Sequence, residues 1–307
     1  MRLYRALCLA ALVLAFVVVV MGAYVRLSDA GLGCPDWPFC YGQPVPAEIA
    51  DRDALAKAWK EMGHRYLAGT LGILLVALAA AAWRLRRSPF LATFIVLLVA
   101  FQATLGKWTV TMLLKPAIVT AHLAGGMSTL ALLAWLALAQ WPHAPAPEMR
   151  ALRPVAALAL AAAALQILLG GWVSANYAAL ACPELPFCAG PMDFANAFHV
   201  VRELGQTAQG ELLSHDALRA IHWAHRLFAL VALTAILIAA VRAWRFAPRL
   251  AAALGVLVAL QFALGVANVA LGLPLALAAA HNAGAALLLV SLVVLNFFAF
   301  RGLRPSP

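Results

Sequence analysis

Four of the eight histidines stand where long apolar segments begin, an unusual place for an ionisable side chain. They form two pairs, His64 with His122 and His225 with His281, and the second pair follows the first by 161 and 159 residues. Ionisable residues inside membrane spans are costly and by default indicate function. Two imidazoles on alternate helices of a four-helix bundle suit the two axial positions of a haem iron, whereas a tetrahedral zinc site needs three or four ligands with Cys or carboxylate among them. The pattern therefore predicts two haem sites, one for each pair.

The two predicted sites differ at one neighbouring position. Glu61 precedes His64 by three residues and so shares a helix face with it, whereas the matching residue in the second pair is His222. A carboxylate beside a haem can accept a proton, stabilise a cation or orient an oxygen nucleophile, although an acid near a helix start is also favoured by the helix dipole alone. We interpret the first pair as the reaction site and the second as a permanent, electron-transferring haem. The remaining histidines, His143, His199 and His215, are expected in solvated loops.

Four of the five cysteines form two pairs with the same spacing, Cys34 with Cys40 and Cys182 with Cys188, whereas Cys8 lies in an apolar run. Because both pairs fall in polar segments, an oxidising compartment would favour a disulfide in each. Thiol exchange is the alternative role, and it requires an activated thiolate that no neighbouring Lys or His suggests. The sequence favours structural bridges and leaves the redox role open.

The chain contains an internal repeat. Cys34-Pro-Asp-Trp-Pro-Phe-Cys40 matches Cys182-Pro-Glu-Leu-Pro-Phe-Cys188 at an offset of 148, and Gly22-Ala-Tyr-Val25 matches Gly170-Gly-Trp-Val173 at the same offset. Further on, Gln102-Ala-Thr-Leu-Gly106 matches Gln261-Phe-Ala-Leu-Gly265, 159 residues later. A longer second loop explains the larger offset. The simplest account is two parallel four-helix halves, residues 1–145 with the reaction site and residues 146–307 with the permanent haem.

The elements that must position these residues are eight apolar runs, each near the roughly 20 residues that a transmembrane helix needs. They cover about 5–25, 64–84, 90–112, 117–139, 154–174, 221–243, 247–270 and 275–299. The first run is longer than a signal-peptide core and has no small-residue cleavage site. With 65% hydrophobic and 11% charged residues, the sequence excludes a water-soluble globular enzyme and a disordered chain. The predicted fold class is an all-α polytopic membrane protein with two pseudo-symmetric bundles.

Charge separates the segments that connect these runs. The chain ends and the short connections 84–89, 140–153 and 242–249 carry 12 of the 22 Lys and Arg residues and one acid, Glu148, whereas the rest, including long segments at 26–63 and 175–220, carries 10 basic and 11 acidic residues. Because Lys and Arg accumulate on the cytoplasmic side, we expect cytoplasmic termini and outward long loops, in a bacterial-type inner membrane. The net charge of +10 therefore reflects orientation and indicates no nucleic-acid partner.

Several polar residues near the expected sites have two interpretations. Arg26, Arg65 and Arg226 are placed to pair with haem propionates or, equally, to anchor the helices at the interface. Gln102 and Gln261 occupy matching mid-helix positions and are expected to form hydrogen bonds between helices.

A longer motif carries a family resemblance. Gly22-x-x-Val25-Arg26-Leu-Ser-Asp29-Ala-Gly31-Leu-Gly33-Cys34-Pro-Asp-Trp37-Pro38, followed by Glu61-x-x-His64-Arg65, His122, His225-Arg226 and His281, resembles the haem A synthase family from about residue 10 to residue 295. The resemblance implies eight helices in two bundles and oxidation of the C8 methyl group of haem O to a formyl group. The product, haem A, serves cytochrome oxidase.

The resemblance also implies roles for single residues. His64 and His122 would bracket the substrate haem, Glu61 would be catalytic, and His225 and His281 would bind the iron of a haem b. Cys34 and Cys40 would correspond to a cysteine pair present in some subgroups of the family, whereas this chain has a second pair as well. Haem O synthase (a farnesyltransferase), cytochrome oxidase assembly factors and a second copy of the chain are the candidate protein partners.

Three other classes are compatible with parts of the pattern. A di-haem b-type electron carrier that oxidises quinol would share the four histidines but would not need Glu61 beside one pair. A thiol oxidoreductase would use the cysteine loops and would not depend on the haems. A repeat-containing transporter would more often have inverted halves or broken helices at the midplane.

Overall fold

The computed structural model describes residues 1–46, 49 and 51–304. Within them, eight helices are long and apolar enough to cross a membrane. These are α1 (Arg2–Leu27), α2 (Arg52–Leu85), α3 (Pro89–Thr111), α4 (Pro116–Leu138), α5 (Arg153–Ala175), α7 (His215–Ala243), α8 (Pro248–Ala270) and α9 (Leu275–Arg301). The shorter elements are β1 (Ala144–Pro145), η1 (Pro147–Leu152), η2 (Ala178–Leu180), α6 (Phe194–Ala197) and β2 (Leu303–Arg304). The predicted all-α membrane fold with eight spans is confirmed.

Two helices begin earlier than their apolar runs. Asp51 caps α2 by accepting hydrogen bonds from the backbone N–H groups of Asp53 and Ala54, and Ser214 caps α7 in the same way. The expectation that His64 and His225 stand at helix starts was therefore wrong, because hydropathy locates only the membrane part of a helix whose first turns are polar. His215, expected in a loop, is the first residue of α7.

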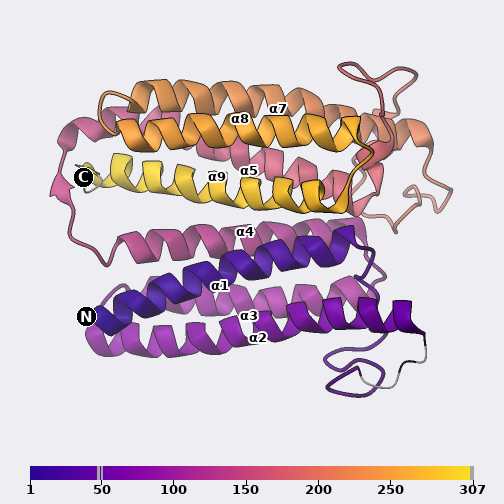
Figure 1. The fold of residues 1–307 in the computed structure, drawn as a ribbon, viewed down its shortest axis with the longest axis horizontal. Helices are drawn as coiled ribbons and strands as arrows, with labels where there is room; N and C mark the ends of the chain where they lie inside the picture. Colours follow the sequence, from indigo (N-terminus) through magenta and orange to yellow (C-terminus); the bar gives the residue numbers. More distant parts are fainter. Residues whose placement is uncertain (47–48, 50, 305–307) are drawn as a thin grey trace.

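The long helices contact one another in two closed rings. In the first ring, α1 and α3 each contact both α2 and α4, and in the second, α5 and α8 each contact both α7 and α9 (Figure 1). The rings meet where α9 contacts α1 and α4, and where α4 contacts α5. Small residues such as Ala11, Ala82, Ala159 and Ala239 are buried at these contacts and let the helices approach closely, which is how packing holds membrane helices together. The boundary near residue 145 stays a prediction.

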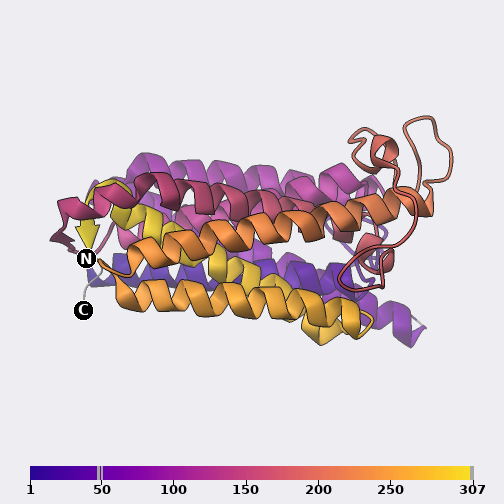
Figure 2. The same ribbon diagram turned by 90° about the horizontal axis from the view of Figure 1, so that it is seen from above.

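The two ends of the molecule differ. Both termini and the connections α2–α3, α4–α5 and α7–α8 lie at one end, whereas the long segments 28–46 and 176–214 and the short α3–α4 and α8–α9 turns lie at the other (Figures 1 and 2). At the first end, β1 pairs antiparallel with β2, so the connection between the rings is tied to the chain's last described residues.

At the loop end, hydrogen bonds join residues that are one repeat apart. An Arg26 Nη atom donates to the backbone oxygen of Ser174 at 2.6 Å, and the Tyr177 hydroxyl donates to the Asp29 carboxylate at 3.0 Å. Each pair is separated by 148 residues, the same offset as the cysteine blocks. Contacts between equivalent positions are expected beside a pseudo-two-fold axis, so they support the predicted relation between the halves, which stays a prediction.

Candidate functional site

The first histidine pair comes from diagonal helices of the first ring. His64 of α2 and His122 of α4 have ring centroids 6.4 Å apart with perpendicular planes. A metal–imidazole bond is about 2.0–2.1 Å long, so two axial ligands place their ring centroids about 6 Å apart. The separation therefore fits two imidazoles on opposite sides of one iron.

Several ring nitrogens at the candidate sites are unpartnered. The Nδ1 atoms of His64, His122 and His281 are buried without a hydrogen-bond partner among the described residues. Buried polar atoms are almost always satisfied, so these imidazoles are free to bind a ligand, although the Nδ1 atoms of His143 and His222, which are not candidate ligands, are unpartnered as well. The described residues contain no group of three or more His, Cys, Asp or Glu side chains able to hold a metal ion, as a zinc site would require. The donor set fits a haem.

The second pair differs in having a polar neighbour. His225 of α7 lies beside Gln166 of α5, whose amide nitrogen is 3.1 Å from Nδ1 and donates to the His225 backbone oxygen at 3.2 Å. The residue 148 positions earlier, beside His64, is Val18, which cannot form a hydrogen bond through its side chain. Gln166 of α5 therefore gives the second imidazole a side-chain partner that the first lacks. The difference between Val18 and Gln166 is visible when the sequences of the halves are aligned. The contact of Gln166 with His225 becomes apparent only from the packing of α5 against α7.

Loss of that contact has a measurable consequence. We expect Gln166→Val to weaken retention of the second-half haem by about tenfold, as for loss of other groups that orient a ligating histidine. Haem content and the low-spin absorption spectrum after dialysis measure the effect. Thr234→Val is the control, since the Thr234 hydroxyl bonds only within α7, to the Leu230 backbone oxygen. Equal retention in both variants would contradict the role given to Gln166.

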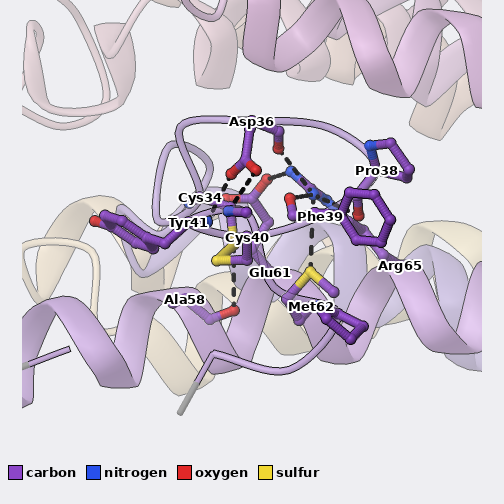
Figure 3. The surroundings of a disulfide bond; sticks show 12 residues. Cys34, Asp36, Pro38, Phe39, Cys40, Tyr41, Ala58, Glu61, Met62 and Arg65 are labelled. Atoms are coloured by element: carbon purple, nitrogen blue, oxygen red, sulfur yellow. Dashed lines mark hydrogen bonds and ion pairs between the residues drawn. A yellow bond between two sulfur atoms is a disulfide. The ribbon is translucent and has the colours of Figure 1, made fainter. Parts of the chain in front are cut away.

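Glu61 lies beneath the first cysteine loop rather than in open solvent. It is 5% exposed, and its carboxylate accepts the backbone N–H of Cys34 at 2.9 Å and an Arg65 Nη atom at 2.5 Å. Figure 3 shows the loop folded over this stretch of α2, with Glu61 and Arg65 reaching up to it. The i, i+4 pair with Arg65 was readable in the sequence, whereas the Cys34 contact was not. Two donors thus fix the Glu61 carboxylate near His64.

Both predicted disulfides are present, Cys34–Cys40 and Cys182–Cys188. The first is fully buried against α2, next to Ala58 and Met62. It closes the loop whose Cys34 N–H reaches Glu61 and so constrains that loop, while the choice between a structural and a redox role stays a prediction. The Cys8 thiol is buried in α1 and forms no disulfide, as expected for a residue that fills apolar space.

The three arginines proposed for propionates bind the chain itself. Arg65 donates to the backbone oxygens of Asp36 and Phe39, and Arg226 donates to those of Glu184 and Cys182. Asp36 and Glu184 are one repeat apart, so the two arginines hold equivalent loops in the same way. These loop contacts were not expected from the sequence, and the two earlier interpretations, propionate pairing and anchoring at the membrane interface, both stay predictions.

The two glutamines of the repeat behave differently. Gln261 of α8 donates to the His281 backbone oxygen in α9 at 2.9 Å, which confirms the expected interhelical bond. Both amide atoms of Gln102 are buried without a partner among the residues that the structure describes.

The loop over Glu61 depends on a glycine. A Cβ atom at Gly33 would lie 2.6 Å from the carbonyl carbon of Lys57 and 2.8 Å from the backbone nitrogen of Ala58. Gly33→Ala should therefore lift the loop and destabilise the fold by about 1–3 kcal/mol, the usual cost of overpacking. A lower thermal midpoint and faster reduction of the Cys34–Cys40 bond would be the signs. Gly69→Ala on α2, where a Cβ atom meets nothing within 4 Å, is the control; if the two variants match, the loop does not need glycine.

The sequence of the chain matches a known protein family. Residues 5–293 match the family described as cytochrome oxidase assembly protein. The chain belongs to this family. Family membership and the motifs agree over nearly the same residues, from α1 to α9.

Relatives in the family carry a common name. A protein named Heme A synthase from Shewanella oneidensis is 43% identical, with 94% of each chain covered. Proteins with the same name from Caulobacter vibrioides and Rhizorhabdus wittichii are 31% and 28% identical, covering 94% and 92% of this chain and 93% and 89% of their own. The resemblance drawn from the motifs is confirmed.

Proposed function

We propose that this protein is a haem A synthase that oxidises the C8 methyl group of haem O to a formyl group, giving haem A for cytochrome oxidase. The observation that carries the proposal is the similarity to relatives of that name across almost the whole chain, at 43% identity in one case. The site is consistent with it, because one imidazole pair has a carboxylate beside it and the other does not.

Each histidine pair has a role in this proposal. His64 and His122 would bracket the substrate haem, which the 6.4 Å centroid separation supports. His225 and His281 would be the axial ligands of a resident haem b, with Gln166 holding His225. When bound, that haem supplies a one-electron relay.

The residues of the first half would act on the substrate methyl group. Its conversion to a formyl group is a four-electron oxidation that replaces two C–H bonds by one C=O bond, and an external electron acceptor or O₂ must take these electrons. Glu61 would accept protons or stabilise positive charge developing on that carbon. Arg65 and the Cys34 N–H keep the Glu61 carboxylate in one position, so that its negative charge is oriented before the substrate arrives.

The proposal includes an orientation in the bacterial cell membrane. The end that holds both termini also holds the connections 84–89, 140–153 and 242–249. Together with the chain ends they carry 12 Lys and Arg residues and one acid, which favours the cytoplasmic side for this end. The disulfide loops would then face the oxidising exterior, where such bonds persist. Haem O synthase, cytochrome oxidase assembly factors and a second copy of the chain remain the proposed partners.

Extraction of haems identifies the function directly. The full chain is expressed with and without a haem O synthase, and the extracted haems are separated and weighed by mass spectrometry. We expect haem A only when haem O is supplied. Haem b bound to the chain with no conversion of supplied haem O would favour the di-haem electron carrier instead.

A further inference from the structure

Each of the four candidate ligands lies with its ring edge against a glycine of the preceding long helix. A Cβ atom added at that glycine would approach the imidazole Cε1 atom to between 2.9 and 3.4 Å. The pairs are Gly22 with His64 at 2.9 Å, Gly106 with His122 at 3.4 Å, Gly170 with His225 at 3.1 Å and Gly265 with His281 at 3.2 Å. The same ring atom meets the missing side chain in all four.

The four contacts repeat with the sequence. Gly22 and Gly170 are 148 residues apart, and Gly106 and Gly265 are 159 apart, which are the offsets of the two halves. Glycines are common in membrane helices because they let backbones approach, so one such contact would be ordinary. Other helical glycines do not contact an imidazole: a Cβ atom at Gly69, Gly72 or Gly255 would meet nothing within 4 Å, and one at Gly125 or Gly284 would meet the side chain of Gln102 or Gln261.

The Cε1 atom is the ring position between the two imidazole nitrogens. A methyl group placed against it displaces or rotates the ring and so moves both nitrogens together. An axial ligand tolerates little of this, because the metal–nitrogen bond must stay close to about 2.0–2.1 Å. The side chain of the glycine position therefore decides where the coordinating nitrogen points.

We propose that Gly22, Gly106, Gly170 and Gly265 are positioning residues that form notches for the four imidazoles and set their axial ligation. This inference rests on the proposed function, since it gives the histidines iron to bind. The notch beside His64 would serve the substrate haem, and the notches beside His225 and His281 the resident one.

Two alanine variants on one helix test the proposal. Gly265→Ala fills a notch, and Gly255→Ala adds the same methyl group to α8 where it has space. In the purified full-length protein we expect Gly265→Ala to lose low-spin haem or to bind it at least about tenfold more weakly, as when a ligand-orienting contact is removed. Gly255→Ala should keep the wild-type spectrum, haem content and reduction potential.

Further variants keep the test independent of folding. Gly170→Ala affects the other ligand of the same haem and should give the same loss, while helix content by circular dichroism shows whether each variant is folded. Wild-type spectra and potentials in both folded notch variants would overturn the proposal. If the wild-type chain itself binds no low-spin haem, the proposed haem site fails; if it binds haem and the notch variants match it, only the notches fail.

Discussion

Replacement of Glu61 by glutamine is expected to stop haem A production while leaving the resident haem bound. Glutamine keeps the size of the side chain and an oxygen that can accept the Cys34 N–H, but it removes the negative charge. General acid–base catalysis is worth about 10²–10⁴-fold in rate, so haem A formed per protein should fall by about that factor.

The same substitution leaves the Arg65 guanidinium without its carboxylate. Arg65 still has the backbone oxygens of Asp36 and Phe39 as acceptors, so we expect a stability loss below the roughly 3–5 kcal/mol of a buried pair broken outright. The thermal midpoint measures this part, and extracted haem A measures the catalytic part.

An ion pair in the first turn of α7 supplies the control. Asp216 and Arg219 form an i, i+3 pair with 2.9 Å between the charged atoms, in the half where we place the resident haem. Asp216→Asn likewise removes the acid of an ion pair with arginine and should leave haem A production near wild type. Full haem A production by Glu61→Gln would refute the role given to this carboxylate.

Replacement of His225 by alanine is expected to abolish the low-spin form of the resident haem. The imidazole would supply one of two axial bonds, and Gln166 would lose its ring partner while keeping the backbone oxygen. The low-spin spectrum of the purified protein should vanish or become high-spin, and haem A production should cease for want of an electron route. Changes of this size are read directly from the absorption spectrum.

Substitutions of two other histidines serve as comparisons for His225→Ala. His64→Ala should leave the low-spin haem in place and abolish haem A, since it alters only the other pair. His199→Ala, an exposed loop residue, should change neither. An unchanged spectrum in His225→Ala would mean that the permanent haem is not in the second half.

Hydropathy and repetition were sufficient to predict the spans and the cysteine pairing. Repetition also singled out four histidines, whose role as iron ligands stays a prediction. Hydropathy missed the first turns of α2 and α7 because residues such as Arg52, Lys57 and Asp216 are polar and lie on helix beyond the apolar run. Glu61 lies in the polar part of α2 that precedes the apolar run, so this part of the helix carries the candidate catalytic residue.

Other features of the site depend on distances between helices and could not be predicted from the amino-acid sequence alone. The contact of Glu61 with the Cys34 backbone requires the loop to fold back on α2, across 27 residues. The glycine notches had a visible signal, since Gly22 matches Gly170 and Gly106 matches Gly265 in the repeat. Their meaning appeared only when each glycine was found against an imidazole edge.

The bond between Tyr177 and Asp29, which joins positions one repeat apart, bears on how such a chain arose. In a symmetric dimer of two identical subunits, a residue on the axis meets its own copy, so an acid would face an acid. Duplication and fusion of a gene remove that restriction, and each copy can then acquire its own residue, a phenol in one and a carboxylate in the other. The same freedom allows Glu61 in one half and His222 in the other, so the two repeats need not carry the same chemistry.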